Sequence, residues 1–497
     1  YITESGNDTN ATGASDDPFR SIQAGINFSS DADSVTVAAG TYVENINFRG
    51  RNIKVVGEDR ETTIIDGDSS GIAVMINNTT SSSLLQGFTI QNGSGSSGFI
   101  NGAGVYCDNC VTVLKNLTVT GNDQDQSGDG SGIYSIQGNV TIENVSVTNN
   151  TGYFGAVGLL NGSTATLNNV TISDNVISVN GGGLYIIQSS TVTISNSEIS
   201  SNTTGSDGGG IYSVSSSITI SNSTINDNIA LNEGGAIRIS ENSLFEMSNS
   251  IVENNQSDSE NSGLISSSST VVITNSVFKG NGYHGIKISG DGPSESSISK
   301  TLVSGHSQGI ASFNGSLAID RCTVVNNGTL GMNFGDAGTR SITNSTIYNN
   351  DQNIEFIGSG GDAVLSISYS DIQGGQDSIV TNDNGTVTWG EGNIDVDPMF
   401  ADTANGNYHL LASSQCINGG HPDSLDSDGS RADMGAYPYL NSYFGPTWYI
   451  TEGGNDTTAT GASDDPFRSI QSGINFSSNN DSVAVAAGTY VENINFR

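Results

Sequence analysis

A short apolar phrase recurs from residue 104 to residue 355 at nearly regular spacing. A second phrase keeps step with it, as in VTISNSEISSN and ITISNSTINDN, where apolar residues alternate with Ser, Thr or Asn. Alternation with a period of two predicts strands. Each unit of 22 to 28 residues is therefore expected to hold about three short strands separated by polar corners. The first apolar residue of each unit falls at Val105, Ile133, Val157, Leu184, Ile211, Ile237, Leu264, Ile286, Ile310, Met332 and Ile354.

One such unit cannot bury its own apolar face, but stacked units can, because each strand then pairs in parallel with its equivalent one coil further on. An Asn closes most units, and His306 replaces it in one. At a corner the Asn amide can bond to the Asn of the next coil, which predicts a ladder that satisfies buried polar groups. The predicted rungs are Asn149, Asn175, Asn202, Asn228, Asn254, Asn281, Asn326 and Asn349.

The charge of the chain limits its partners. Acidic residues number 51 against 15 Lys and Arg, which gives a net charge of −36 although only 13% of residues are charged. Nucleic acid is excluded as a partner, because binding phosphates requires Lys and Arg to release counterions. Anionic membrane surfaces and polyanionic glycans are disfavoured unless a metal ion bridges them. No apolar run is long enough to span a bilayer, so no membrane insertion is expected.

The opening of the sequence returns at its end. Residues 1–49 align without gaps with residues 449–497, and 43 of the 49 positions are identical. The six differences all lie between small or polar residues. We therefore expect the chain to be a window of a longer polypeptide in which a module of 448 residues repeats in tandem.

The coils resemble the right-handed parallel β-helix of the pectin lyase-like superfamily, and the resemblance covers nearly the whole chain. The stretch DPFRSIQAGINFSSDADSVTVAAGTYVENINF looks like the opening of bacterial secreted or surface domains of this family, in which a short amphipathic helix caps the core. Pro18 suits the first turn of such a helix after a cap at Asp16 or Asp17. One apolar helical face would then be formed by Phe19, Ile22 and Ile26.

The segments GNIDVDPMF and DSDGSRADMGAYPY look like the closing part of the same family. The resemblance therefore implies an all-β right-handed parallel β-helix with a short N-terminal capping helix. The expected boundaries are a cap and first coils at 1–68, regular coils at 69–375, a closing segment at 376–439, a linker at 440–448 and the start of the next module at 449–497.

The superfamily includes polysaccharide lyases, which need a base and acids or calcium, and glycoside hydrolases, which need two carboxylates. Bases are few in these coils, and the strongest cluster contains His284, Lys287 and Asp291. Polygalacturonase-like enzymes carry a His-Gly pair, and here His284 is followed by Gly285. They also carry Asn-Thr-Asp and Asp-Asp signatures, which are absent from the corresponding coils. We therefore favour the interpretation that His284 and Lys287 occur by chance in an ordinary coil over a catalytic site. No catalytic residue or cofactor is assigned.

Two further groups suggest binding. Tyr residues that share one phase are either an exposed stripe for sugar rings or a packing ladder: Tyr106, Tyr134, Tyr185 and Tyr212. A loop with closely spaced carboxylates suits a structural Ca²⁺, unless the acids accept from backbone N–H groups and one pairs with Arg431. The candidate ligands are Asp423, Asp426, Asp428 and Asp433.

The four cysteines predict no zinc site. Cys107 and Cys110 form a lone CDNC motif, which suits a local disulfide or two packed thiols. Cys322 and Cys416 are either buried in the core or paired with each other.

The favoured function is structural: an extracellular or cell-surface, non-enzymatic repeat protein that forms a fibre, filament or adhesin-like stalk. Its partners would be neighbouring copies of the module, arranged head-to-tail or laterally. The alternatives are a polysaccharide lyase or glycoside hydrolase and a carbohydrate-binding β-helix, both with an extracellular glycan as partner.

Overall fold

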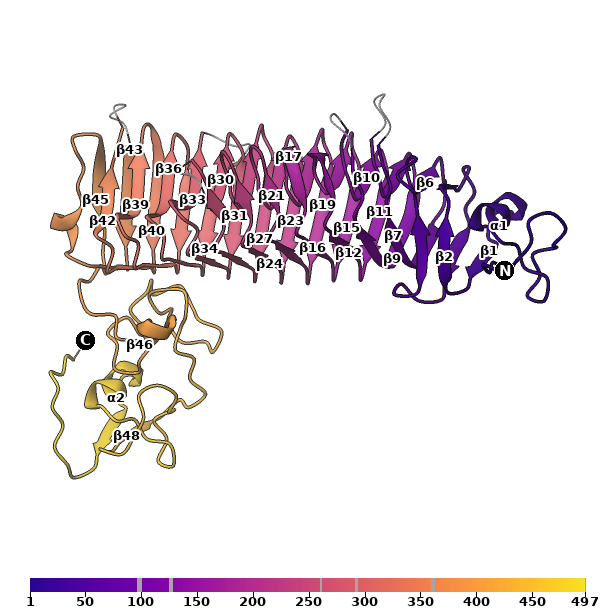
Figure 1. Cartoon of the computed structure of the whole chain (residues 1–497). Coiled ribbons are helices and arrows are strands. Elements are labelled where there is room, and N and C mark those ends of the chain that lie inside the picture. The colour runs from indigo at the N-terminus through magenta and orange to yellow at the C-terminus, as the bar shows by residue number, and fades with distance from the viewer. Residues whose placement is uncertain (96–100, 125–127, 260–261, 291–293, 359–362, 497) are drawn as a thin grey trace. The chain divides into compact units, whose positions relative to one another are not determined.

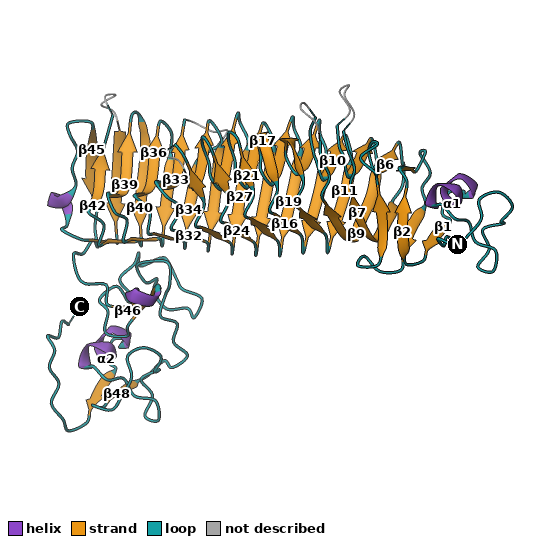
Figure 2. Ribbon diagram, viewed as in Figure 1, coloured by secondary structure: helices purple, strands orange, loops and turns teal. Residues whose placement is uncertain are grey.

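The structure is a computed structural model that describes residues 1–95, 101–124, 128–259, 262–290, 294–358 and 363–496. It divides into two compact units, one made of Tyr1–Val271 with Val277–Ser294 and the other of Val272–Ser276 with Glu295–Arg497. Both consist mainly of short strands, and the described residues contain two α-helices, α1 (Ile22–Phe28) and α2 (Ile470–Phe476). Figure 1 and Figure 2 show that the strands of each unit stack as consecutive coils. The predicted all-β parallel solenoid is confirmed.

In the first unit each regular coil contributes one strand, which carries the GIY-type phrase, to a parallel sheet that we call the GIY sheet. Equivalent residues pair in register, as Ile211 does with Ile237. The strands are, in order, β3 (Ile46–Asn47), β6 (Val74–Asn77), β8 (Val105–Asp108), β10 (Ile133–Ile136), β14 (Val157–Leu160), β18 (Leu184–Ile187), β22 (Ile211–Val214), β26 (Ile237–Ser240), β30 (Leu264–Ser267) and β33 (His284–Ser289).

The other two strands of each coil belong to a second parallel sheet, the bent sheet. Its first row contains β1 (Ser34–Val37), β4 (Lys54–Gly57), β11 (Asn139–Glu143), β15 (Thr164–Asn168), β19 (Thr191–Ser195), β23 (Ser217–Ser221) and β27 (Leu244–Ser248). Its second row contains β2 (Gly40–Val43), β5 (Thr63–Asp66), β12 (Ser146–Thr148), β16 (Thr171–Ser173), β20 (Glu198–Ser200), β24 (Thr224–Asn226), β28 (Ile251–Glu253) and β32 (Val277–Lys279). The long strands β7 (Ser83–Gln91) and β9 (Val111–Thr120) run through both rows.

The second unit continues the same plan. Its GIY strands are β36 (Gln308–Phe313), β39 (Leu330–Gly335) and β42 (Gln352–Phe356). Its bent sheet begins at the end of β31 (Thr270–Thr274) and contains β34 (Ser296–Ser299), β37 (Leu317–Asp320), β40 (Gly338–Thr343), β43 (Ala363–Ser368), β45 (Gly385–Trp389), β35 (Leu302–Ser304), β38 (Thr323–Val325), β41 (Thr346–Tyr348) and β44 (Asp371–Ile372). Parallel pairing therefore extends to Trp389, beyond the expected last coil residue 375.

Five coils of the first unit carry a fourth short strand that the sequence did not reveal. These strands form a separate parallel sheet of β13 (Thr151–Phe154), β17 (Val176–Asn180), β21 (Thr203–Thr204), β25 (Ile229–Ala230) and β29 (Gln256–Ser257). They lie in coils whose repeat intervals are 24 to 27 residues.

The predicted Asn ladder is present. Successive rungs are buried, and each donates its side-chain N–H to Oδ1 of the next at 2.8–3.0 Å. Each also donates to a backbone carbonyl of the preceding coil at 2.8–3.1 Å. The rungs of the first unit are Asn122, Asn150, Asn175, Asn202, Asn228, Asn255 and Asn281. Those of the second are His306, Asn327 and Asn350, and the backbone N–H of His306 donates to Asn327 Oδ1 at 3.1 Å.

Four predicted rungs were wrong by one residue: Asn149, Asn254, Asn326 and Asn349. Each has a positive φ of 53–56° and turns the corner, and the Asn that follows it is the buried rung. Asn is one of the few residues that tolerate the left-handed region, so both positions of an Asn-Asn pair accept the same residue type.

The N-terminal helix begins later than predicted. Helix α1 starts at Ile22 because the Ser21 side chain accepts from Ala24 N at 3.2 Å, and the Glu44 carboxylate accepts from the N–H of Ile22 at 2.7 Å. Pro18 and the two preceding aspartates lie in the turn before it, and Phe19 forms a parallel bridge with Ile2. The apolar helical face is confirmed in part, since Ile22 and Ile26 are buried on it.

The short helix η1 (Gln376–Ser378) lies between β44 and β45, and after the last coil the chain forms η2 (Thr403–Asn405) and an antiparallel pair, β46 (Phe400–Asp402) with β47 (Asn407–Leu410). This closing segment packs against coils of its own unit: Asn326 Nδ2 donates to Tyr408 Oη at 2.8 Å, and Ala436 N donates to Thr323 Oγ1 at 2.9 Å. No described helix is long and apolar enough to cross a membrane.

The cysteines are now assigned. Cys107 and Cys110 form a disulfide, which is one of the two predicted alternatives. Cys322 and Cys416 are buried and not joined to each other. Burial raises the pKa of the Cys322 thiol to about 12, so it is a protonated core residue.

Candidate functional site

The second copy of the opening sequence folds as a second cap. Helix α2 begins after Ser469, whose side chain accepts from Ser472 N, and the Glu492 carboxylate accepts from Ile470 N at 2.7 Å. These contacts repeat those of Ser21 and Glu44 around α1. The two copies therefore form the same local structure, one at the start of the first unit and one at the end of the second.

The second cap packs against an aromatic residue that precedes the repeated sequence. Trp448 lies in β48 (Thr447–Ile450), which pairs in parallel with β49 (Ser482–Val485). Its ring is 2% exposed, stacks on Phe467 and packs 5.7 Å from Phe476, and its indole N–H donates to Asp481 Oδ2 at 3.0 Å. Tyr443 closes the other side edge-on at 5.1 Å. The linker thus supplies part of the core beneath the second cap.

Polar contacts join this cap to the closing segment. Asn475 is 6% exposed, and its side-chain N–H donates to the carbonyls of Ala412 at 2.9 Å and Ser414 at 2.8 Å. Asn418 Nδ2 donates back to the carbonyl of Asn475 at 3.1 Å. Further along, Tyr439 Oη donates to the Ala459 carbonyl at 2.6 Å. We call these contacts and the Trp448 cluster the junction.

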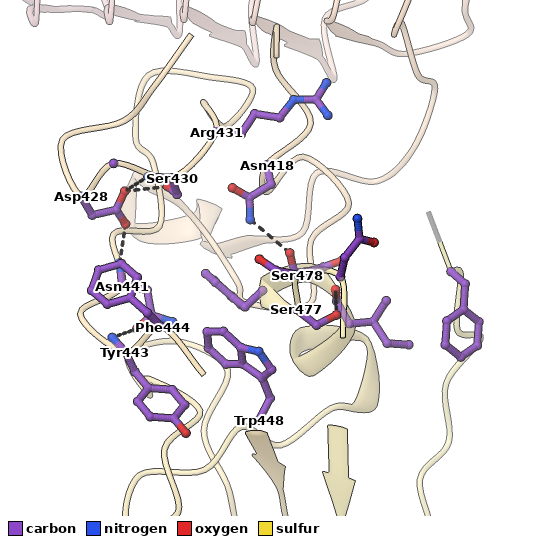
Figure 3. A pocket seen from close by; sticks show the side chains of 16 residues that line it. Asn418, Asp428, Ser430, Arg431, Asn441, Tyr443, Phe444, Trp448, Ser477 and Ser478 are labelled. Atoms are coloured by element: carbon purple, nitrogen blue, oxygen red, sulfur yellow. Dashed lines mark hydrogen bonds between the residues drawn. The ribbon is translucent and has the colours of Figure 1, made fainter. Parts of the chain in front are cut away.

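A pocket of about 650 Å³ opens beside the junction (Figure 3). Its walls include Trp448, Asn418 and Asp428, together with Ile474 and Phe496 of the second cap. The equivalents of the last two residues, Ile26 and Phe48, are fully buried in the first cap, under the coils that follow it. Ile474 and Phe496 thus occupy positions that belong to the core in the first cap.

Three of the four aspartates predicted to bind calcium, Asp426, Asp428 and Asp433, accept hydrogen bonds from the protein. Asp433 accepts from the N–H groups of Asn418 and Tyr439 at 2.7 Å each, and burial raises its pKa to about 8. Asp426 accepts from Asp433 N at 2.8 Å and lies 3.9 Å from Arg321.

Asp428 accepts from Ser430 and from Asn441 N (Figure 3). Asp423 is exposed. Across residues 1–95, 101–124, 128–259, 262–290, 294–358 and 363–496, no three His, Cys, Asp or Glu side chains are grouped as a metal site. The alternative to calcium also paired Arg431 with one of these acids, whereas in the structure Arg431 donates to the carbonyls of Gly420 and Gly419.

The Tyr residues on the outer face of the GIY sheet form two stacks, not one stripe. Tyr106 stacks on Tyr134 at 5.5 Å, and Tyr185 stacks on Tyr212 at 5.6 Å. Gly158 occupies the intervening register position, between Tyr134 and Tyr185. Phe154 fills this gap from the neighbouring strand β13 and stacks on Tyr185 at 4.8 Å.

An acidic residue lies beside these stacks, and sequence reasoning missed it. Burial raises the pKa of Asp129 to about 6, and the same carboxylate contributes to a raised pKa at Tyr134 and Tyr185. Asn101 Oδ1 accepts from Asp129 N at 3.1 Å, and its Nδ2 donates to Tyr134 Oη at 2.8 Å. No local motif marks Asp129, because stacking of distant coils creates its environment.

His284 and Lys287 are not brought to one face. Both lie in β33, where His284 has the parity of the inward-facing Ile286 and is 6% exposed. Lys287 has the opposite parity, since side chains alternate along a strand. Asp291 lies outside the described residues.

Comparison with known proteins identifies the coils. The family model described as a right-handed beta helix region matches residues 101–264 and 235–397, which together cover more than half of the chain. The family described as a protein of unknown function (DUF1565) matches residues 452–495, within the second cap. No curated protein matches the chain.

Solved structures align loosely with it. A pectate lyase has 14% identity and a TM-score of 0.33, covering 88% of this chain and 95% of its own. The A-modules of two mannuronan C-5 epimerases from Azotobacter vinelandii have 13% and 12% identity with TM-scores of 0.32 and 0.27, each covering 76% of this chain and 94% of the module. Similarity at this level assigns no activity to this chain.

Proposed function

Because this chain belongs to the right-handed β-helix family, we propose that it is a structural module of a tandem, extracellular β-helical polypeptide, in which each closing segment binds the cap of the module that follows it. One observation carries this proposal. The second copy of the cap sequence forms the same cap as the first and is bound through Trp448 and Asn475 to the segment that precedes it.

The physics of solenoids supports this role. The end of a stacked sheet presents unpaired N–H and C=O groups and an open core, which must be covered to prevent uncontrolled association. A junction that covers the end of one module with the cap of the next solves this problem along the whole polypeptide. The net charge of −36 adds repulsion between neighbouring polypeptides, so end-to-end order is favoured over lateral association.

The disulfide supports the extracellular location. Cys107 and Cys110 are joined, and such bonds persist mainly in oxidising compartments. An exported fibre or stalk meets this condition.

The proposal is tested by separating the junction from the rest of the full chain. Phe476→Asp places a charge against Trp448 and should abolish hydrogen-exchange protection of residues 449–485, while the coils keep theirs. Phe28→Asp, the same change in the same sequence context of the first cap, should leave the second cap protected. If residues 449–485 exchange as fast in the unchanged protein as in Phe476→Asp, the junction is refuted.

A second function is favoured by one observation, the half-buried Asp129 beside stacked aromatic rings. Aromatic faces bind sugar rings, and a carboxylic acid that titrates near neutrality can act as a general acid. Tyr134 is 1% exposed and offers no ring face, whereas Tyr185, Tyr212 and Phe154 are partly exposed. Neutral and uronate oligosaccharides should therefore be titrated against the full chain.

In that titration Tyr212→Ala should weaken binding, and loss of turnover without loss of binding in Asp129→Asn would indicate a hydrolase or lyase. Tyr283→Ala is a control, because Tyr283 packs on His284 away from the two stacks. Absence of binding to every oligosaccharide would rule this function out.

A further inference from the structure

The first cap presents, uncovered, the surface that the second cap uses at the junction. Phe28 is 76% exposed, although its equivalent Phe476 packs on Trp448. Asn27 is exposed, although its equivalent Asn475 is buried on two carbonyls of the closing segment. The residues that the second cap buries at the junction are therefore open on the first cap.

The chemistry of this surface is conserved between the copies. The second-cap residues that hydrogen-bond or stack at the junction are identical in the first cap, whereas Ser472, which is buried in the second cap, corresponds to the partly exposed Ala24. The pairs, second cap first, are Asp456 and Asp8, Ala459 and Ala11, Thr460 and Thr12, Phe467 and Phe19, Asn475 and Asn27, Phe476 and Phe28, and Asp481 and Asp33.

The surface is also preformed. Phe19 and Phe28 stack at 5.0 Å with an interplanar angle of 18°, against 5.2 Å and 21° for Phe467 and Phe476. Asp33 accepts from Ser30 N at 2.7 Å, as Asp481 does from Ser478 N, which holds its carboxylate in the orientation that receives the Trp448 indole. Little reorganisation is therefore needed for binding.

We propose that the exposed face of the first cap binds the closing segment and linker, residues 412–448, of a second copy of this chain. This inference rests on the proposed function and names the partner of the first cap. Trp448 of the second copy packs on Phe28 and donates to Asp33, and Asn27 donates to the carbonyls of Ala412 and Ser414. The arrangement is an exchange of near-identical elements, because the incoming cap replaces the one already attached to that segment.

Within one chain, the second cap binds residues 412–448 in preference to the first cap of another chain. A short tether gives it an effective concentration in the millimolar range, so the unchanged protein should be monomeric at micromolar concentration. Releasing the attached cap should vacate residues 412–448 and allow head-to-tail association through the first cap of another chain.

The test is sedimentation velocity on the full chain from 1 to 100 μM, a range of about two orders of magnitude chosen to bracket typical association constants. Phe476→Asp should convert the monomer into a concentration-dependent series of oligomers. Adding Phe28→Asp to this variant should weaken the association by at least about 30-fold, as expected from the loss of one buried Phe. Phe28→Asp alone should stay monomeric.

The outcomes separate the inference from the proposed function. If Phe476→Asp releases the second cap in hydrogen exchange but remains monomeric at 100 μM, the inference is wrong and the junction within the chain stands. If the double variant associates as strongly as the single one, the contact does not use Phe28 and the inference is again wrong. Circular dichroism of all variants confirms that the coils are folded. Oligomers of Phe476→Asp that vanish in the double variant support the inference.

Discussion

Asn475 donates its side-chain amide to the carbonyl oxygen of Ala412 at 2.9 Å, and the two residues are 63 positions apart in the chain. The same amide reaches Ser414, so one side chain satisfies two carbonyls of the closing segment. The equivalent Asn27 of the first cap is exposed. Asn475 therefore anchors the junction through polar contacts. Asn27 provides a control position for the same substitution.

Asn475→Ala should weaken the junction by about 2 kcal/mol, because it leaves two carbonyls without their donor. The local opening free energy from hydrogen exchange of residues 470–476 measures this loss. Asn27→Ala should change the opening of residues 470–476 by less than about 0.5 kcal/mol, because an exposed substitution away from the junction has little effect. An equal effect of the two variants would contradict the assignment.

Replacing one rung of the Asn ladder should destabilise the first unit strongly. Asn228→Ala removes the acceptor of Asn202 and the donor to Asn255 and to the Ile199 carbonyl. Each buried group left unsatisfied costs about 1–3 kcal/mol, so a loss of about 3 kcal/mol is expected in urea unfolding. The control is Asn222→Gly at an exposed corner with a φ of 48°, which glycine accepts without strain. If Asn228→Ala leaves the free energy of unfolding nearly unchanged, the ladder does not stabilise the protein.

Asp129 should make the stability of the first unit depend on pH. Its pKa in the folded state is raised from 3.8 to about 6 by burial, so the folded state binds a proton that the unfolded chain releases between these values. Stability should therefore fall as pH rises through this window and stay level above it.

Asp129→Asn should abolish this part of the pH dependence and raise stability at pH 7 by at most about 3 kcal/mol, since one pKa unit corresponds to about 1.4 kcal/mol. Thermal unfolding from pH 3.5 to pH 7.5, which spans the titration range of such a carboxyl group, is the measurement. Asp123→Asn at an exposed position nearby should retain the fall. If stability depends on pH in the same way in Asp129→Asn and in the unchanged protein, this prediction is wrong.

The disulfide should contribute modestly. Cys107 and Cys110 are three positions apart, and the loop that they close is short. Closing a short loop removes little entropy from the unfolded chain, so replacing both residues by Ser should cost no more than about 2 kcal/mol. The difference in melting temperature with and without reductant measures it, and the double Ser variant should show no response to reductant.

The coils could be predicted from the sequence because apolar residues alternate and the corners recur in register. Parallel stacking of equivalent strands is the arrangement that buries all of these apolar residues. The rungs were harder to predict. Where the residue before the rung is Asp174 or Ser201, only one Asn is present and the rung is correct, whereas in an Asn-Asn pair both positions tolerate Asn. The fourth strand spans two to five residues, which is too short to carry an apolar pattern of its own.

The candidate sites depended on contacts that no local pattern contains. Asp129 acquires its environment from Tyr134 and Tyr185, which belong to different coils. Phe28 and Phe476 lie in the same local sequence, INFSS, yet one is exposed and the other packs on Trp448. Aspartates spaced like calcium ligands are engaged by backbone N–H groups, a competing use of the same oxygens that spacing alone does not reveal.

The direction of the Asn ladder has a consequence for how such proteins change over evolutionary time. Every rung gives its amide hydrogen to the coil that follows and takes one from the coil before, so all internal rungs are equivalent. Duplication or deletion of one entire coil leaves this row unbroken, whereas loss of the segment that holds a rung interrupts it. Genes for this architecture are thus free to lengthen or shorten by one entire repeat, and intervals of 22 to 28 residues keep the same row.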